Sequence, residues 1–232
     1  MPKICVAITA SNVEDARKDA RRAMKLGANL VEHRIDFIKN PNSNKVSDLF
    51  NGKNYPAIIT NRRKEEGGKF KGDDIERTNL LIDSLNSQEF RPDFVDIELE
   101  TAEHNRNFLI AATKFSGIKS IISKHIMNFT PDLDQLVAVY DISRTLGADI
   151  VKIVTFANSK SDNEIIYRLI EKTKGGPPLI ALAMGEFGKE TRIESVKRGA
   201  FLTFASLESG KESAPGQIPI HEMKKAFEQI ES

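Results

Sequence analysis

The sequence predicts a closed (β/α)8 barrel, an α/β fold in which helices surround eight parallel strands. The chain has 232 residues, a length that one such barrel commonly takes. Short runs rich in β-branched residues alternate with longer amphipathic segments, as a parallel sheet covered by helices requires. Eight units of about 29 residues each fit a closed barrel better than an open sheet. No linker or composition shift divides the chain, so we expect one barrel domain over residues 1–232.

Eight apolar runs are short enough for strands and are bounded by Gly, Pro, Asp and Asn, which commonly flank strands. They span 3–9, 29–35, 56–60, 93–99, 118–123, 149–155, 178–184 and 200–205. Helical patterns follow at 12–26, 74–87, 102–115, 131–146, 161–174, 189–198 and 218–230. Asp132 and Asp162 stand where an N-cap or first-turn carboxylate favours helix initiation. Left-handed C-caps are expected at the glycines that follow helical stretches, namely Gly27, Gly147, Gly175 and Gly199.

Composition and charge exclude several classes of protein. Hydrophobic residues make up 40% of the chain and charged residues 29%, which is typical of a globular protein. A net charge of +1 argues against nucleic-acid and membrane partners. Cys5 is the only cysteine, so the chain has no internal disulfide or cysteine-rich zinc site, and we expect no metal. With neither a long apolar span nor a signal-peptide pattern, the sequence predicts a cytoplasmic protein.

Ionisable residues gather where barrel chemistry is expected, at the C-terminal ends of the strands. Glu32 and Arg34 are two positions apart on the second predicted strand and therefore share a face. Asp96 and Glu98 have the same spacing on the fourth strand, and His125 lies just past the fifth. Each has a simpler interpretation, since a Glu–Arg pair at this spacing is often a same-face ion pair. A lone histidine is more typical of a loop or a core than of a catalyst.

Lys152 is harder to explain structurally, because it stands in the middle of the sixth apolar run. A lysine with apolar neighbours on both sides either extends to the surface or is buried for a purpose. Burial beside other cations favours the neutral amine, a nucleophile suited to Schiff-base formation. Arg34, Arg62 and Arg192 are the candidate cations for this effect.

These positions belong to an ordered series that runs nearly from end to end of the chain. The series comprises Glu32-x-Arg34, Thr60-x-Arg62, Glu66-Gly67-Gly68, Asp96-x-Glu98-Leu99, Ser123-x-His125, Asp149-x-x-Lys152, Met184-Gly185, Arg192 and Ser213-Ala214-Pro215-Gly216-Gln217. It resembles the type I 3-dehydroquinate dehydratase family. The resemblance implies a (β/α)8 barrel and a hydro-lyase that converts 3-dehydroquinate to 3-dehydroshikimate in the shikimate pathway of aromatic amino acid biosynthesis. It implies no metal or organic cofactor, and it suggests a homodimer.

The resemblance also implies roles for individual residues. Lys152 forms an imine with the substrate ketone, His125 transfers protons as base and then acid, and Glu66 orients His125. A histidine with its ordinary pKa of about 6.5 can act in both directions near neutral pH. Arg192 is expected to bind the substrate carboxylate. Ser213 and Gln217, on a loop expected to close as a lid, are expected to contact the same end of the substrate. The substrate-binding residues implied are Glu32, Arg34, Arg62, Arg192, Ser213 and Gln217.

Three positions depart from the family pattern and affect the expected shape of the pocket. Ala7 replaces a serine found in some members, His33 an aromatic residue, and Met127 the phenylalanine of a His-x-Phe pattern. Two other functions are weighed against the dehydratase. A class I aldolase-type barrel also uses a strand lysine, but Glu208 makes the loop after the eighth strand a poor phosphate site. A catalytically silent binding barrel would not need Lys152 and His125 together.

Overall fold

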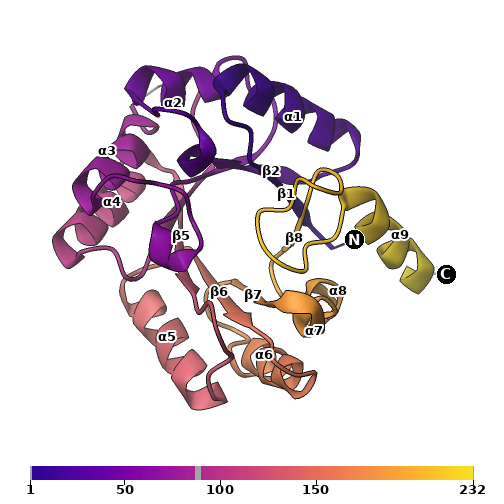
Figure 1. The fold of residues 1–232 in the computed structure, drawn as a ribbon. Coiled ribbons are helices and arrows are strands. Elements are labelled where there is room, and N and C mark those ends of the chain that lie inside the picture. The colour runs from indigo at the N-terminus through magenta and orange to yellow at the C-terminus, as the bar shows by residue number, and fades with distance from the viewer. Residues whose placement is uncertain (1, 87–89, 232) are drawn as a thin grey trace.

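The computed structural model describes residues 2–86 and 90–231, and it forms a ring of eight strands with helices outside it (Figure 1). The strands are β1 (Ile4–Ile8), β2 (Leu30–Arg34), β3 (Ala57–Thr60), β4 (Phe94–Glu98), β5 (Lys119–His125), β6 (Ile150–Phe156), β7 (Leu179–Met184) and β8 (Thr203–Ala205). All pair in parallel, in the order β7-β6-β5-β4-β3-β2-β1-β8. The predicted α/β barrel is therefore confirmed.

The helices cover the outside of the barrel. They are α1 (Val13–Lys25), α2 (Ser43–Phe50), α3 (Asp74–Asp83), α4 (Glu103–Ser116), α5 (Leu133–Thr145), α6 (Ser161–Lys172), α7 (Gly185–Gly188), α8 (Thr191–Lys197) and α9 (Ile220–Glu231), with short 3-10 turns η1 (Ile35–Phe37) and η2 (Lys64–Glu66). In the part of the chain that the structure describes, no helix combines the length and apolarity that a membrane span needs. The predicted helix over 74–87 ends earlier, at Asp83, and residue 87 lies outside the described residues.

The helix α2 is absent from the sequence-based prediction, which was wrong to leave 36–55 without one. Its first turn is capped by Asn42, whose side chain accepts the Lys45 N–H at 3.0 Å. It has eight residues and buries Val46, Leu49 and Phe50. Two turns contain too few apolar positions to give a clear helical period, so the segment reads as a loop.

The residues predicted to begin and end helices have the expected conformations and contacts. Asp132 caps α5 by accepting the Gln135 N–H at 2.9 Å, and Asp162 lies in the first turn of α6. Positive φ values of 84° to 109° occur at all four glycines expected to end helical stretches: Gly27, Gly147, Gly175 and Gly199. His125 differs slightly from expectation, because it is the last residue of β5 instead of the first residue beyond it.

Two apolar clusters fill the molecule, one between the strands and the helices and one inside the barrel. The inner cluster includes Ile150 and Val154 of β6. Since side chains alternate along a strand, Lys152 between them also points inward. Along β6, Lys152 thus has an apolar neighbour on each side inside the barrel. Its polar partners, Glu32 and Asp96, come from β2 and β4.

The barrel has a seam between β7 and β8. Among the described residues no strand ladder joins these two, although the Phe201 N–H donates to the Leu179 carbonyl at 2.7 Å. The carbonyl of Phe204 on β8 instead accepts a hydrogen bond from Arg192 Nη1 at 3.4 Å. The seam therefore lets an arginine from the outer helix α8 reach the inside of the barrel mouth.

Candidate active site

A cavity of about 110 Å³ lies at the C-terminal ends of the strands. Its lining contains all the site residues that the sequence analysis named: Lys152, His125, Glu66, Glu32, Arg34, Arg62, Arg192, Ser213 and Gln217. A larger groove of about 1150 Å³ between η1, α2 and α3 contains none of them. The smaller cavity is therefore the candidate site, because it lies where a barrel places its chemistry.

Lys152 lies at the centre of the ionisable residues inside the barrel. Its side chain is only 5% exposed, and its Nζ donates to Asp96 Oδ2 at 3.0 Å and to Glu32 Oε1 at 3.3 Å. The Nζ also lies 4.3 Å from the centroid of the Phe204 ring. Glu32, Asp96, Lys152 and Phe204 come from β2, β4, β6 and β8, so they form one barrel layer built from alternate strands. We name this set the lysine layer.

The direct partners of Lys152 are acids and not the arginines that the sequence suggests. The groups within ion-pair distance of Lys152 Nζ are the two carboxylates of the lysine layer. Burial opposes ionisation of both acids. For Glu32, neighbouring Lys152 and Arg34 outweigh burial and lower the carboxyl pKa below its usual range. For Asp96, Arg62 and Lys152 lower the pKa far below that range. Both acids are therefore charged, and they stabilise the positive charge on Lys152.

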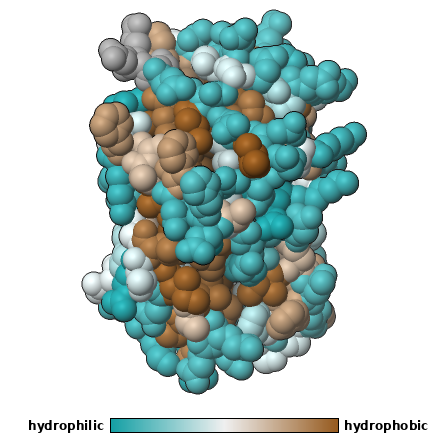
Figure 2. All heavy atoms as spheres, turned by 90° about the vertical axis from the view of Figure 1, so that its left-hand side faces the viewer, coloured by the Kyte–Doolittle hydropathy of each residue, from teal (hydrophilic) through white to brown (hydrophobic). Residues whose placement is uncertain are grey.

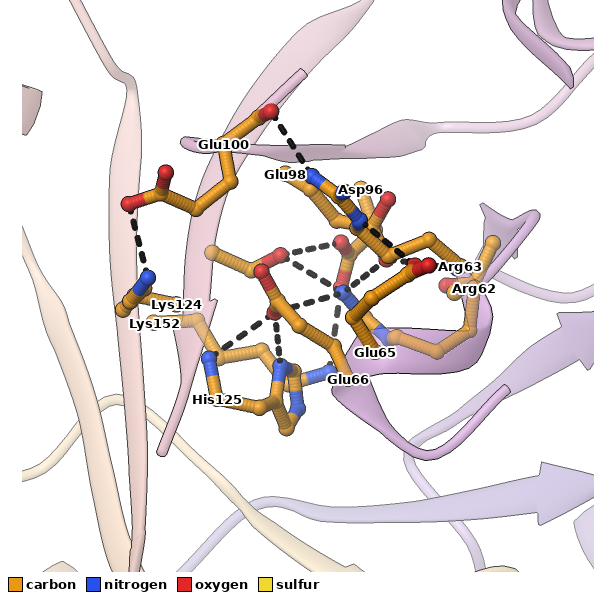
Figure 3. A network of polar contacts seen from close by, with 12 residues as sticks. Arg62, Arg63, Glu65, Glu66, Asp96, Glu98, Glu100, Lys124, His125 and Lys152 are labelled. Atoms are coloured by element: carbon orange, nitrogen blue, oxygen red, sulfur yellow. Dashed lines mark hydrogen bonds and ion pairs between the residues drawn. The ribbon is translucent and has the colours of Figure 1, made fainter. Parts of the chain in front are cut away.

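His125 is held from two sides by one carboxylate oxygen. Glu66 Oε2 accepts the backbone N–H of His125 at 2.9 Å and lies 3.0 Å from its Nδ1 (Figure 3). This contact places the ring proton on Nδ1 and leaves Nε2 free to act as a base. The His125 side chain is 11% exposed, and burial together with Arg62 and Lys152 lowers its pKa well below the ordinary value. This direction favours the neutral imidazole, the form that a general base requires.

The 3-10 turn η2 positions Glu66 for this contact. Gly67 follows with a φ of 80°, a left-handed conformation that glycine adopts without strain. At Gly68 a Cβ would lie 1.9 Å from the Arg62 carbonyl oxygen, so no larger residue fits. Burial raises the pKa of Glu66, and the Arg62 charge offsets this only in part. The tight glycine turn therefore fixes the acid that orients His125.

Arg62 is the hub of the network behind His125 (Figure 3). Its Nη2 donates to Asp96 at 2.7 Å, and its Nη1 donates to Ser123 at 2.9 Å and to Glu98 at 3.1 Å. Glu98 also pairs with the buried Arg77. The sequence analysis placed Arg62 with the substrate, whereas its strongest contacts are to the protein. Asp96 and Glu98, two positions apart on β4, are part of the motif series, but the sequence does not indicate that they are partners of Lys152 and Arg62.

Arg192 differs from every other buried arginine near the site, because no acid faces it among the described residues. Its side chain donates to three backbone carbonyls, those of Gly216 at 2.8 Å, Pro215 at 3.1 Å and Phe204 at 3.4 Å. It is 1% exposed, and burial lowers its pKa to about 10. A buried guanidinium without a counter-ion at a cavity wall is suited to an anionic ligand.

Ser213 and Gln217 pair with each other at the mouth. The Ser213 N–H donates to Gln217 Oε1 at 2.7 Å, and Gln217 Nε2 donates to Ser213 Oγ at 2.9 Å. Their loop is attached to the barrel through Arg192. Met127 lines the cavity and covers Gly67, as a Cβ there would lie 2.8 Å from its Cε. It thus occupies the part of the wall where the resemblance expects an aromatic ring.

The other two departures lie away from the cavity lining. Ala7 is buried on β1, and His33 is buried on β2 with its ring edge against Phe50 and its Nε2 3.5 Å from the Tyr55 hydroxyl. Over 2–86 and 90–231, no group of three His, Cys, Asp or Glu side chains is arranged to hold a metal ion. A buried amine, a neutral histidine and an unpaired guanidinium thus face one small cavity. The fold and the site together therefore define a class of protein, an α/β-barrel enzyme that acts on a small anionic carbonyl compound.

Comparison with known proteins narrows this class to one family. A family model described as type I 3-dehydroquinase matches residues 4–232. The 3-dehydroquinate dehydratase of Methanococcus maripaludis strain C7 is 38% identical over 227 residues, covering 98% of this chain and 99% of that protein. The chain belongs to the type I 3-dehydroquinase family. Its activity is accordingly the dehydration of 3-dehydroquinate in the shikimate pathway.

Solved structures agree with this assignment over the whole barrel. The 3-dehydroquinate dehydratase of Geobacillus kaustophilus is 26% identical with a TM-score of 0.91, covering 100% of this chain and 91% of that one. The type I enzyme of Clostridium difficile, solved with covalently modified comenic acid, is 26% identical with a TM-score of 0.89, covering 99% and 92%. These assignments set aside the aldolase and silent-barrel alternatives.

Proposed function

We propose that Lys152 forms the covalent intermediate of the dehydration and that His125, oriented by Glu66, transfers the protons. The observation that carries this proposal is the lysine layer. Lys152 is the one lysine among the cavity-lining residues, and it lies against two carboxylates. The Clostridium difficile relative was solved with covalently modified comenic acid, which supports a covalent step in the reaction.

The first step forms a carbon–nitrogen bond between Lys152 Nζ and the substrate ketone. The Lys152 ammonium gives up a proton, the free amine adds to the carbonyl carbon, and the former carbonyl oxygen takes up that proton. Loss of the carbonyl oxygen as water leaves an iminium. Its positive charge remains against the same carboxylates and the Phe204 ring, so the layer stabilises the intermediate.

The second step is elimination. The iminium withdraws electrons and makes the adjacent C–H acidic, and neutral His125 takes this proton through Nε2. The resulting enamine expels the hydroxyl group, which leaves as water with the proton from His125. Hydrolysis of the iminium then releases product and restores Lys152. Since Glu66 fixes Nδ1, the histidine ring stays aligned through both proton transfers.

We propose that Arg192 binds the substrate carboxylate and that Ser213 and Gln217 close over it. The unpaired guanidinium supports this assignment, because an incoming carboxylate supplies the missing counter-ion. Arg34, Arg62 and Glu32 complete the binding site for the ring hydroxyls. The reaction uses only these side chains and needs no cofactor. We further propose that the protein is cytoplasmic and that it forms a homodimer. The homodimer is supported by the exposed apolar side chains of Phe108 and Phe115 on α4 and Ile142 on α5.

Borohydride trapping tests the covalent role. With 3-dehydroquinate present, borohydride should reduce the iminium and attach a substrate-derived mass to the peptide containing Lys152. Lys152→Met should abolish labelling, whereas Lys124→Met is the matched control. Lys124 is a strand lysine that pairs with Glu100 at 2.7 Å and does not line the cavity. Labelling that persists in Lys152→Met and disappears in Lys124→Met would transfer the covalent role to Lys124.

The same experiment separates the two residues. His125→Ala should still be trapped, but its turnover should fall by about 10² to 10⁴ because proton transfer is lost. Turnover is followed by the absorbance of the conjugated enone product. A variant that turns over at the wild-type rate would exclude His125 as the proton-transfer residue.

A further inference from the structure

Asp36 is a fully buried carboxylate that does not line the cavity but contacts two segments that do. It stands in η1, directly after β2, and its side chain has no exposed surface. Its Oδ1 accepts a hydrogen bond from Arg34 Nε at 2.8 Å, and its Oδ2 accepts one from Arg34 Nη2 at 2.7 Å. The same Oδ2 accepts the backbone N–H of Lys69 at 3.0 Å.

The first contact fixes the direction of the Arg34 guanidinium. Two parallel hydrogen bonds to one carboxylate leave a single planar orientation. The guanidinium also lies 5.0 Å from the centroid of the Phe37 ring, which limits movement on another side. Nε and Nη2 are occupied, and Nη1 has no hydrogen-bond partner among the described residues. Because Arg34 lines the cavity, Asp36 leaves this donor available to a bound ligand.

The second contact fastens the segment that carries Glu66. Only Gly67 and Gly68 separate Glu66 from Lys69, and the second of these glycines is packed directly on the Arg62 carbonyl. The segment is therefore held at one end by the contact between Glu66 and His125 and at the other by Asp36. One carboxylate thus joins the end of β2 to the turn after β3.

We propose that Asp36 is a positioning residue for the dehydration, acting through Arg34. It does not touch the substrate, and its effect is to hold Arg34 Nη1 where a ring hydroxyl is bound. This inference rests on the proposed function, because it requires Arg34 to contact the substrate. A merely structural carboxylate would alter stability and leave substrate binding in the folded fraction unchanged.

Asp36→Asn tests the proposal, since asparagine keeps the shape but replaces one acceptor oxygen by a donor facing Arg34. KM for 3-dehydroquinate should rise by about tenfold, which corresponds to about 1.4 kcal/mol of binding free energy. The value of kcat and the yield of borohydride-trapped Lys152 at saturating substrate should stay near wild type. Asp36→Glu keeps the charge but displaces the fork, so its KM should lie between the two.

A double-mutant cycle shows whether Asp36 acts through Arg34. In an Arg34→Gln background, where the charged fork is absent, adding Asp36→Asn should leave KM unchanged. An equal rise of KM in both backgrounds, or none in the wild-type background, would overturn the proposal. If Asp36→Asn does not fold, the comparison between Asp36→Glu and wild type decides, and an unchanged KM there also overturns it.

Asp93→Asn is the matched control. Asp93 likewise accepts one backbone N–H, from Ala57 at 2.8 Å, and pairs with one cation, Lys53 at 2.7 Å, but it precedes β4 at the opposite end of the barrel. Its loss should lower thermal stability without moving KM. Borohydride labelling that persists in Lys152→Met would refute the proposed function itself, whereas the Asp36 proposal is judged only by the ratio of KM between each variant and wild type.

Discussion

At the scale of single residues, the main difference within the site is between arginines that have acids and the one that does not. Arg34 and Arg62 are neutralised by Asp36 and Asp96 in short contacts of 2.7 Å. Arg192 has backbone carbonyls alone, so its charge is uncompensated inside the barrel mouth. An arginine whose charge an acid already balances can still donate to a neutral hydroxyl, whereas an unpaired arginine is ready to bind an anion.

Arg192 should therefore control binding more than chemistry. Arg192→Ala should raise KM by roughly 10²-fold, which corresponds to about 3 kcal/mol of lost binding free energy. Arg192→Lys keeps the charge but loses the fork, and its KM should rise less. The decisive ligand is a substrate analogue without the carboxylate, measured by calorimetry. Wild type and Arg192→Ala should bind it equally, and much weaker binding by the variant would place Arg192 elsewhere.

Residue types and spacing predict the members of the site but not their partners. All the predicted residues do surround one cavity, because strand-end positions converge at a barrel mouth. The contacts of Lys152 with acids and the contacts of Arg62 with β4 depend on the barrel register, which brings alternate strands into one layer. A linear pattern does not contain that register, so Asp96 and Asp36 were not recognised as contributors.

At the scale of elements, β2 presents different chemistry to its two sides. Glu32 and Arg34 face the cavity, while His33 between them is buried beside Phe50 of α2. Burial, aided by the charge of Lys53, lowers the pKa of His33 to about 4. Its Nδ1 has no hydrogen-bond partner among the residues that the structure describes. The packing of α2 on β2 therefore depends on an uncharged histidine.

His33 should make the protein less stable as the solution becomes acidic. Below the unfolded pKa of about 6.5, the unfolded chain binds a proton that the folded chain refuses until about pH 4. The free energy of unfolding should thus fall by about 1.4 kcal/mol per pH unit in this window from His33 alone, and the lowered pKa of His125 acts in the same direction. His33→Phe should have a shallower loss between pH 7 and 5 in urea titrations. Parallel curves for variant and wild type would contradict this account.

The loop over 206–217 should act as a lid that orders when ligand binds. Its far end is tied to Arg192, but Lys211 is exposed and its side chain makes a long contact, at 3.4 Å, with Asp19. Bound carboxylate draws Ser213 and Gln217 inward, so a substrate analogue should slow tryptic cleavage after Lys211. Cleavage after Lys174, an exposed site at the opposite end of the barrel, provides the internal control. Equal rates at Lys211 with and without saturating analogue would exclude a lid.

Element prediction succeeded where period and end signals coincide. Long amphipathic segments with a capping acid or a following glycine, such as α1 and α5, were found near their true bounds. The helix α2 was missed because two turns give little periodicity, and α8 begins two residues after its predicted start. The ladder between β7 and β8 is interrupted by a side chain from a helix, which strand composition does not indicate.

At the scale of the whole molecule, one side of the barrel exposes several large apolar side chains on neighbouring helices. Phe108 is 56% exposed and Phe115 is 95% exposed, one above the other on α4, and Ile142 on α5 is 53% exposed. Figure 2, which faces this side, shows hydrophobic atoms gathered in a band across it. Both signs of charge border the band, with Lys114 on α4 and Asp141 on α5. A second copy related by a two-fold axis can pair these opposite charges.

A charge in this band should therefore weaken self-association. Phe115→Lys should shift the protein from dimer to monomer in sedimentation experiments, because the interface would bury an unpaired ammonium. Phe187→Lys is the control, since Phe187 on α7 is also exposed but lies off this side of the barrel. Wild-type protein that sediments as a monomer at all concentrations would refute the homodimer.

The lysine layer has a consequence for how this barrel evolves. Glu32, Asp96 and Lys152 occupy interior positions that a non-catalytic barrel fills with aliphatic side chains. Replacing a buried ion cluster by apolar residues of similar volume is often neutral or stabilising, whereas losing one member commonly costs about 3–5 kcal/mol. The layer thus provides reactivity at a cost in folding stability, because each buried charge is tolerated only while the others balance it. Replacing the three together should therefore cost less folding stability than replacing one alone, which constrains the order in which they can change.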